Sequence, residues 1–465
     1  MKGIVFLFLI FSLTAQASDS LKILSEEQFV EIVRTYHPVA RQAQLLVDRA
    51  RAELLAARAG FDPQFYVYAD RKTFDGKVYY DYTHPQVKIP TWFGMEVKAG
   101  LEENVGSFRN PESSEGQSSY MGLTMPLLKN LVMDKRRAAL RQAQLFREQS
   151  KAEQLLMIND LLMDAYDAYW QWVNTYETFQ ILADAVRVNE QRLSLIRLGY
   201  QQGERPAIDT TEALTQLQSF ELAREQARLE WRNSTFMLSN YLWSAASVPV
   251  ELPETVVPDK RWQIPSIPNA TLPVMQELLQ QARAEHPKLN MYGFKLDMLE
   301  VEKRLKFQNL LPTANVSYNF LSKGYNIWNN PNAALFSNNF KYGLEIGLPL
   351  RLSQGRGEYR AAKIKIQETR LDLAQERLAI DNKIQSYFNE LSLLRQQVVI
   401  AEKAFANHQR LFNGEDLRFK AGESSLFLLN ARENKVLEAR QKLVQLKTKF
   451  YKAYRAVGWA AGQLR

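Results

Sequence analysis

The amino-acid sequence predicts a mainly α-helical protein with transmembrane β-strands, built twice from one helix–strand–strand–helix unit. Two observations carry this prediction. Motifs of the first half recur in the same order in the second half. In both halves, aromatic stretches with the alternation of strands lie beside long stretches with the apolar spacing of coiled coils. A chain of 465 residues that is 46% hydrophobic is long enough for a large core.

The chain begins with the features of a secretory signal peptide at residues 1–17. Lys2 precedes an apolar run at 4–13, and small residues at 15–17 form a cleavage site. We therefore exclude this segment from the fold and place the mature chain outside the cytoplasm. No later stretch approaches the roughly 18 apolar residues of a membrane helix, so any membrane insertion must use strands.

Composition excludes several function classes. The chain has no cysteine, and therefore no disulfide, no thiolate chemistry and no lipid anchor on an N-terminal Cys. Its net charge is +8, but charges of both signs are interspersed along the helices, which favours solvated helical faces over a nucleic-acid partner. The motifs of enzymes, cofactor sites and metal sites do not occur. We expect no enzymatic activity, no cofactor, no metal and no nucleic acid.

Four matches define the repeat. His37-Pro38 corresponds to His286-Pro287, and Pro63 corresponds to Pro312 at the same offset. Two further pairs follow in order: "GLTMPLL" (122–128) with "GLEIGLPLR" (343–351), and "RLGYQQGERPAIDTTEA" (197–213) with "RFKAGESSLFLLNA" (418–431). A period of this length is too long for a solenoid unit. We expect two related halves, 18–246 and 274–465, joined by a proline-rich connector at 247–273.

Each half is predicted to run from a helix through strands into two long helices separated by a glycine break. In the first half we expect strands within about 61–127 and long helices at about 130–200 and 208–243. In the second half we expect strands at about 313–350 and long helices at about 356–418 and 424–455. The aromatic strand residues suit membrane interfaces. Four strands per chain are too few to close a barrel, and open edges are costly in a bilayer, so several chains must share one barrel.

The first half carries extra residues between its helix end and its last strand. Pro63 and Pro126 are 63 residues apart, whereas Pro312 and Pro349 are 37 residues apart. The extra segment, within 77–117, has the pattern of an added strand pair and a polar loop. We expect a long extracellular loop or a lid over the mouth, with a larger strand arrangement at the barrel rim as the alternative.

The ordered set of motifs resembles the TolC family of outer-membrane efflux and secretion channels. The helix ends "ARAGFDP" and "QNLLP", the passages "TMPLL" and "GLPLR", and "RFKAGESSLFLLNARE" (418–433) carry this resemblance, which covers essentially the whole mature chain. It implies a homotrimer with a twelve-stranded barrel in outer-membrane lipid and an α-barrel in the periplasm of a Gram-negative cell. It also implies that the glycine breaks are hairpin tips, where the tube closes and a periplasmic adaptor docks, linking it to an inner-membrane pump.

The resemblance assigns adaptor docking and pore constriction to these tips. Family members with a pore ringed by aspartates carry them just after the second glycine, where this chain has the acid-free stretch 426–430. Asp209 is then the one candidate for an acidic ring, in a tip lined mainly by apolar and amide groups. Gly203 to Ala213 is one residue longer than Gly422 to Ala431, so we expect two different turns. The candidate tip residues are Arg197, Gly203, Glu204, Asp209, Arg418, Gly422, Glu423, Ser424, Leu428 and Asn430.

Two other function classes stay open. A periplasmic adaptor has one helical hairpin on a small β domain, whereas this chain shows two hairpins and aromatic strands. A secreted coiled-coil structural protein would explain the helices but not the strands. His37 and His286 could suggest a metal pair, but no partner ligands lie near them in sequence, and helix capping is the preferred role. The exported substrate, the pump and the adaptor are not encoded in these motifs.

Overall fold

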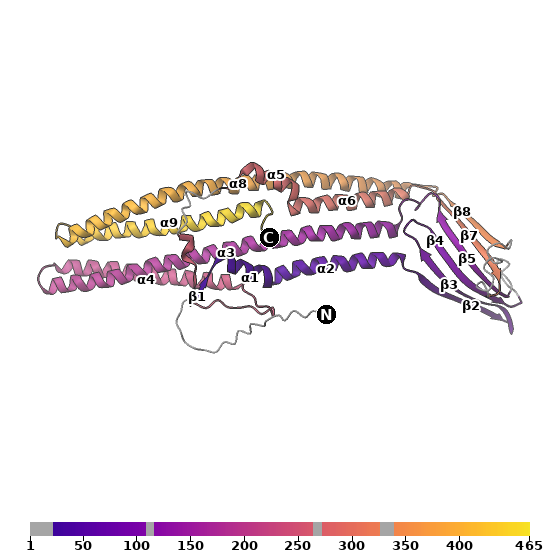
Figure 1. Ribbon diagram of the computed structural model, residues 1–465, viewed down its shortest axis with the longest axis horizontal. Helices are drawn as coiled ribbons and strands as arrows, with labels where there is room; N and C mark the ends of the chain where they lie inside the picture. Colours follow the sequence, from indigo (N-terminus) through magenta and orange to yellow (C-terminus); the bar gives the residue numbers. More distant parts are fainter. Residues whose placement is uncertain (1–21, 108–115, 264–271, 326–338) are drawn as a thin grey trace, which may run out of the picture.

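The computed structural model describes residues 22–107, 116–263, 272–325 and 339–465. The predicted signal peptide, part of the predicted loop and part of the predicted connector lie outside these residues. The chain forms an elongated rod of helices with a β-sheet at one end (Figure 1).

Two long helices set the length of the rod. They are α3 (Lys135–Gln201) and α8 (Ser353–Lys420). At 1.5 Å per residue, each extends about 100 Å. Two shorter helices cover each of them in turn, as Figure 1 shows. They are α2 (Pro38–Arg58) and α4 (Ala207–Ser239) on α3, and α6 (Pro287–Gln308) and α9 (Leu426–Ala460) on α8.

The regularly spaced apolar residues of α3 form much of the core. Tyr169 and Trp172 lie one turn apart and are fully buried. The Tyr169 hydroxyl donates to the Leu24 carbonyl (3.0 Å), and the Trp172 indole N–H donates to the Thr235 hydroxyl of α4 (3.2 Å). Because the Tyr169 hydroxyl and the Trp172 indole N–H both have hydrogen-bond partners, these large side chains are buried without leaving a donor unsatisfied.

Short elements pack around the middle of the rod. They are β1 (Lys22–Leu24), α1 (Glu26–Tyr36), β6 (Val256–Pro258), a 3₁₀ helix (Lys260–Gln263) and α5 (Met275–Glu285). β1 and β6 pair in parallel, and the rings of Trp170 and Tyr451 stack at 4.6 Å. The Tyr451 hydroxyl donates to the Trp262 carbonyl (3.0 Å), which ties the segment between the two halves to the rod.

Both His-Pro pairs begin a helix. The Nδ1 atom of His37 accepts a hydrogen bond from the Val39 backbone N–H (3.3 Å), and His286 does the same for Lys288 (3.2 Å). The proline that follows each histidine suits the first helical position. The preferred capping role is confirmed. Among the described residues, no group of three or more His, Asp or Glu side chains is arranged to hold a metal ion.

A six-stranded antiparallel sheet occupies the far end of the rod, in the order β2-β3-β4-β5-β7-β8. The strands are β2 (Gln64–Phe74), β3 (Lys77–Pro90), β4 (Glu96–Val105), β5 (Gly116–Pro126), β7 (Thr313–Lys323) and β8 (Phe340–Gly347). The prediction of four strands per chain is wrong, since the described residues of one chain form six. The twelve-stranded count concerns an assembly of three chains and stays a prediction. Residues 77–105 form a hairpin that continues the ladder, because both of its strands find backbone partners within the sheet.

The added strand pair predicted within 77–117 is confirmed, whereas most of the polar loop predicted after it lies outside the described residues. Residues 77–90 and 96–105 are strands of the sheet, as the alternative of a larger strand arrangement requires, and residues 108–115 lie outside the described part of the chain. A tight connection between β3 and β4, closed by a hydrogen bond from the Thr91 N–H to the Met95 carbonyl (2.8 Å), leaves no long loop there.

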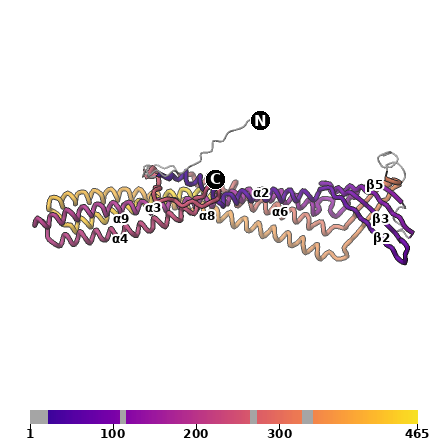
Figure 2. The backbone as a smooth tube through the Cα atoms, turned by 90° about the horizontal axis from the view of Figure 1, so that it is seen from below, coloured from indigo at the N-terminus to yellow at the C-terminus, as the bar shows by residue number. Residues whose placement is uncertain are grey.

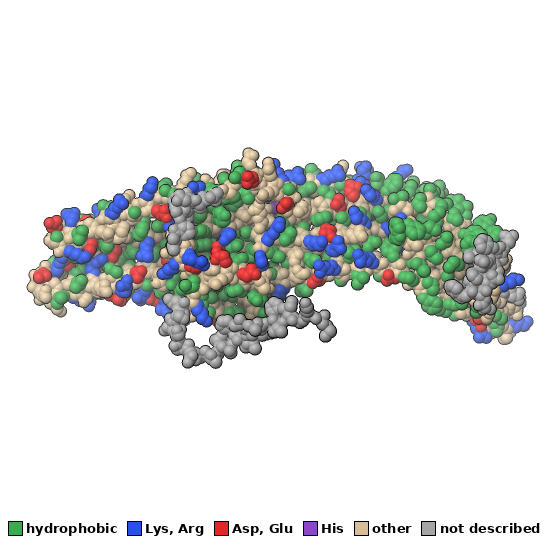
Figure 3. Space-filling model, viewed as in Figure 1, with side chains coloured by type: hydrophobic (Ala, Val, Ile, Leu, Met, Phe, Trp, Pro, Cys, Tyr) green, Lys and Arg blue, Asp and Glu red, His purple; other side chains and the backbone are tan. Residues whose placement is uncertain are grey.

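The two faces of the sheet differ in polarity because successive side chains of a strand point to opposite sides. In β8, Tyr342, Leu344 and Ile346 share an exposed apolar face, whereas Lys341 and Glu345 lie on the other face. Figure 3 shows apolar side chains gathered over the sheet, while charged side chains follow the helices.

The opposite, polar face of the sheet carries a ring cluster around His84. Its Nε2 atom lies 2.9 Å from the Tyr120 hydroxyl, which also lies 3.2 Å from Gln86 Oε1. Gly100 leaves room for the Tyr120 ring, because a Cβ atom there would lie 2.7 Å from that ring.

Within the described residues, no helix is both long enough and apolar enough to cross a membrane.

We predict that the buried cap at His286 makes stability pH-dependent. Burial lowers the pKa of His286 to about 4, below its value of about 6.5 in the unfolded chain. The unfolded state therefore binds an extra proton between these values, and stability is lost as the pH falls from about 6.5 towards 4. The loss should be at most about 2 kcal/mol at pH 5.

Thermal unfolding of the purified protein at pH 7.5 and pH 5 measures this effect. His286→Asn keeps a capping side chain without a titrating group, so its melting temperature should fall less than that of the parent. His408→Asn, in the last four turns of α8, is the matched control and should behave like the parent. An equal drop for His286→Asn and the parent would contradict the prediction.

Candidate functional site

The two glycine breaks lie together at the end of the rod opposite the sheet (Figures 1 and 2). Gly203 and Gly422 both have a φ of +78°, a conformation that glycine adopts without steric cost. The Gly203 N–H donates to the Tyr200 carbonyl (3.0 Å), and the Gly422 N–H donates to the Phe419 carbonyl (3.1 Å). The Glu204 N–H donates to the Gly199 carbonyl and the Glu423 N–H to the Arg418 carbonyl, both at 2.8 Å. Both helices therefore end in a Schellman motif.

The expectation of two different turns is wrong for the backbone. Five residues separate the helices in each case, 202–206 between α3 and α4 and 421–425 between α8 and α9. The extra residue before Ala213 lies inside α4, because Ala213 and Ala431 do not occupy equivalent helical positions. What differs is the start of the next helix. The Ser425 hydroxyl accepts from the Leu428 N–H (3.3 Å), whereas Pro206 has no capping side chain.

Arg205 joins the two tips. Its guanidinium lies over the Phe419 ring at 4.3 Å from the centroid, and it donates to the Phe419 carbonyl (3.4 Å). The same guanidinium lies 3.8 Å from Asp209, one turn into α4. The carboxylate of Asp209 is thus held beside a cation rather than pointing freely into water, and its side chain is 18% exposed.

An apolar seam holds the two hairpins together behind the tips. Leu426 and Leu429 are 1% exposed and belong to one cluster with Leu193 and Leu217 of the other hairpin. Phe427, in contrast, is 71% exposed, so only part of the apolar stretch 426–429 packs inside one chain.

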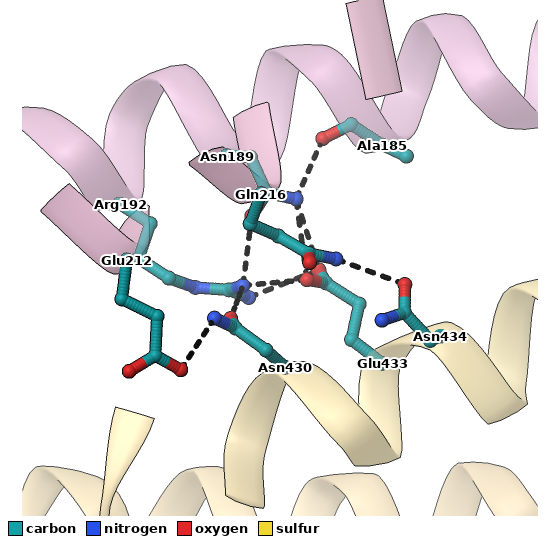
Figure 4. A network of polar contacts seen from close by, with 8 residues as sticks. All are labelled: Ala185, Asn189, Arg192, Glu212, Gln216, Asn430, Glu433 and Asn434. Carbon is teal, nitrogen blue, oxygen red and sulfur yellow. Dashed lines mark hydrogen bonds and ion pairs between the residues drawn. The ribbon is translucent and has the colours of Figure 1, made fainter. Parts of the chain in front are cut away.

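A buried polar network interrupts this seam (Figure 4). The Arg192 guanidinium of α3 donates to both carboxylate oxygens of Glu433 on α9, at 2.6 and 3.0 Å. The Asn189 amide donates to the same carboxylate at 3.2 Å. Asn430 lies beside this pair, with its oxygen 3.4 Å from Arg192 and its amide 3.3 Å from Glu212 of α4. Five polar side chains from three helices thus satisfy one another within the seam.

The other candidate tip residues lie as follows. Ser424 donates to the buried Glu415 (2.5 Å), and Arg418 lies 3.7 Å from the same carboxylate. Glu204 and Glu423 are exposed at the turns, Arg197 is exposed on α3, and Leu428 is partly buried. The structure therefore brings Asn430 into a contact between the hairpins. Arg418 and Ser424 contact Glu415 within their own hairpin.

Sequence reasoning missed Arg192, Glu433, Asn189 and Arg205. A signal for two of them exists. Asn189 continues the apolar spacing of α3 from Val186 to Leu193, and Glu433 continues that of α9 from Leu429 to Val436. A polar residue on an apolar stripe must find a buried partner, and that partner is what the sequence does not show.

A hollow of about 820 Å³ lies where the sheet meets the helices. Its walls are largely polar and include Glu96, Asp134, Arg136, Lys306 and Glu358. Lys306 and Glu358 pair at 3.1 Å. A charged hollow next to the polar face of the sheet provides a wetted surface on that side.

Long helices that end in paired glycine turns, joined to an antiparallel sheet with one apolar face, are the features that the resemblance to outer-membrane channels predicted. A model of the outer membrane efflux protein family matches residues 33–242 and 278–463. The chain belongs to this family, as its resemblance to TolC-type channels predicted. Its members are outer-membrane channels for efflux.

Solved structures of outer-membrane channels have the same fold. The Campylobacter jejuni channel CmeC is 15% identical, with a TM-score of 0.64 over 94% of this chain and 86% of that chain. The open state of Neisseria gonorrhoeae MtrE is 13% identical, with a TM-score of 0.64 over 97% of this chain and 94% of that chain. VceC from Vibrio cholerae is 14% identical, with a TM-score of 0.62 over 94% of this chain and 96% of that chain. No curated protein sequence matches the chain significantly.

We predict that Glu433→Ala loosens the seam between the hairpins. The substitution leaves the Arg192 guanidinium buried without its carboxylate, which costs about 3–5 kcal/mol. Hydrogen exchange of the backbone amides of 185–200 and 426–440 should then show faster local opening, while the sheet keeps its protection.

Glu438→Ala is the matched control on the same helix. Its carboxylate pairs with Lys435 on the exposed surface (2.8 Å), and exposed pairs contribute about 0–1 kcal/mol. Equal opening rates for the Glu433 and Glu438 variants would show that the buried network does not hold the hairpins.

Proposed function

We propose that three copies of this chain form an export conduit. In this proposal the sheets join into a barrel in outer-membrane lipid, and the helices form an α-barrel in the periplasm. A periplasmic adaptor docks on the tips and connects the conduit to an inner-membrane pump. The observation that carries the proposal is the apolar face of the sheet, whose unpaired edge strands β2 and β8 have no other way to be satisfied in a bilayer.

Exposed apolar side chains on the helices support an assembly of several copies. Leu195 on α3, Ile208 on α4, Leu417 on α8 and Phe427 on α9 are each 67–71% exposed in the single chain. All four lie near the tips, where Leu198, Tyr200 and Leu411 are also about half exposed. Burying each such side chain contributes about 1.5–3 kcal/mol, which favours neighbouring copies packed side by side.

Matching turns and caps in the two halves of the chain support an origin by duplication. They also give each copy two hairpin tips at which an adaptor could dock. The Schellman turns at Gly203 and Gly422 have the same length and hydrogen bonds, and the His37 and His286 caps have the same geometry. We propose that adaptor docking uses the exposed residues Arg197, Glu204 and Glu423. Asp209 and Leu428 occupy equivalent positions six residues after each glycine, and we propose that both face the constriction.

Membrane fractionation with gel electrophoresis tests the assembly. We expect the protein in the outer-membrane fraction, running as a trimer without heating and as a monomer after boiling. A water-soluble monomer would instead favour a periplasmic adaptor or a secreted coiled-coil protein. Insertion into planar bilayers should give discrete conductance steps, which neither alternative produces.

We predict that Asp209→Asn weakens the sensitivity of the conductance to divalent cations. Three symmetry-related carboxylates would form the acidic ring. Because Arg205 lies 3.8 Å from each carboxylate and offsets part of its charge, removing the three carboxylates should raise the concentration of Mg²⁺ that halves the current by only a few-fold. Single-channel recording measures this concentration.

Asp184→Asn, on the exposed surface of α3 beside Arg187, is the matched control and should leave the Mg²⁺ response unchanged. The same response in the parent and in Asp209→Asn would rule out an acidic ring at Asp209.

A further inference from the structure

We infer that three copies of this chain close a barrel of eighteen strands, in which β2 of one copy pairs with β8 of the next. The inference rests on the proposed homotrimer and deepens it by giving the width of its outer-membrane end. It follows from the inserted hairpin β3–β4, which raises the contribution of each chain to six strands.

The inserted strands are long enough to cross a bilayer. A tilted transmembrane strand needs about 9–11 residues. β3 has 14 residues and β4 has 10, compared with 11 each for β2, β5 and β7. Strands that lay outside the bilayer, at the rim of a narrower barrel, would not need 10 or more residues.

The inserted strands also continue the lipid-facing pattern of their neighbours. In β3, Val87 and Ile89 alternate with the polar Gln86 and Lys88. The strand register places one residue of each strand in a single row across the apolar face. That row is Phe65, Val87, Ala99, Met121, Phe320 and Phe340. An unbroken apolar row through β3 and β4 is expected of strands in the barrel wall, where outward residues contact lipid.

The turn of the inserted hairpin lies at the helical end of the sheet. Gly94 in this turn has a φ of +97°, and a Cβ atom there would lie 2.9 Å from the Arg137 guanidinium at the start of α3. Arg137 is held by Asp134 at 3.3 Å, and Glu96 lies 3.9 Å from Arg136. A hairpin fastened to the helices at its turn runs along the wall. It does not fold across the mouth.

The edges of the sheet fit one another across a chain boundary. All neighbours in the sheet are antiparallel, so β2 and β8, at opposite ends of a six-stranded order, run in opposite directions. β8 of one copy can therefore pair with β2 of the next and keep the alternation around the ring. Every residue of β2 is exposed in the single chain, and each unpaired backbone group would cost several kcal/mol in lipid.

An eighteen-stranded wall makes the outer mouth wider than a twelve-stranded one. Barrel diameter grows roughly linearly with strand number, so the diameter should be about 1.5 times larger. Barrels of this size leave an aqueous channel. The barrel would therefore admit solutes much bulkier than a twelve-stranded wall could pass, and the narrowest point must lie elsewhere in the conduit.

Electron cryomicroscopy of the full-length protein in lipid nanodiscs tests the inference directly. We expect a threefold particle with eighteen strands in the wall and a β2–β8 contact at each chain boundary. A threefold channel with twelve strands in its wall, and the β3–β4 hairpin outside it, would overturn the inference but leave the proposed function standing. A particle that is not a trimer would overturn both.

Polymer exclusion in planar bilayers gives a second readout. Deleting residues 77–106 removes β3 and β4 but keeps β2 followed by an antiparallel β5. Polyethylene glycols added on the barrel side should enter the parent up to a size about 1.5 times larger than in the deletion variant. Asp75→Gly, in the β2–β3 turn where Asp75 has a φ of +51°, keeps six strands and should retain the parent cut-off. Equal cut-offs for the parent and the deletion would overturn the inference.

Discussion

The burial of the apolar stripes of α3 and α8 is the interaction on which the rest of the structure depends. A single helix of about 100 Å cannot bury its apolar stripe by itself, so two shorter helices pack along each long helix. The chain must therefore reverse direction at both ends of the rod. At one end the reversal requires the glycines at 203 and 422, and at the other the chain passes into strands. The rod, its tips and its sheet are therefore consequences of one packing requirement.

The seam between the hairpins combines this apolar packing with a buried ion pair. Leu426 and Leu429 would hold α9 against α3 without it, and replacing buried ion pairs with apolar side chains is often neutral for stability. The bidentate contact between Arg192 and Glu433 adds direction, because it forms in only one register of the two helices. Apolar stripes alone would let the hairpins slide by a turn. The polar network sets the relative position of the tips, and Arg205 extends that control to the turns themselves.

The sheet shows how a chain can gain strands without losing its topology. A hairpin adds one strand in each direction, so β2 and β5 keep their orientation when β3 and β4 lie between them. The inserted residues need only the alternation of apolar and polar side chains and a tight turn, both of which the segment 77–105 has. This alternation was visible in the sequence as a possible strand pair. Whether that pair extended the sheet or covered its mouth depended on backbone partners, which no local pattern specifies.

The sequence by itself determined the helical rod, the glycine turns, the histidine caps and the family, because each depends on local spacing or local hydrogen bonds. The tertiary structure decided what depends on contacts between distant segments. Arg192, the partner of Glu433, lies 241 positions away along the chain, and no local sequence pattern near either residue identifies the other. The same holds for Arg205 and Phe419, and for the six-stranded order of the sheet. Local periodicity shows that a polar residue or a strand needs a partner. Only the folded chain shows which partner satisfies it.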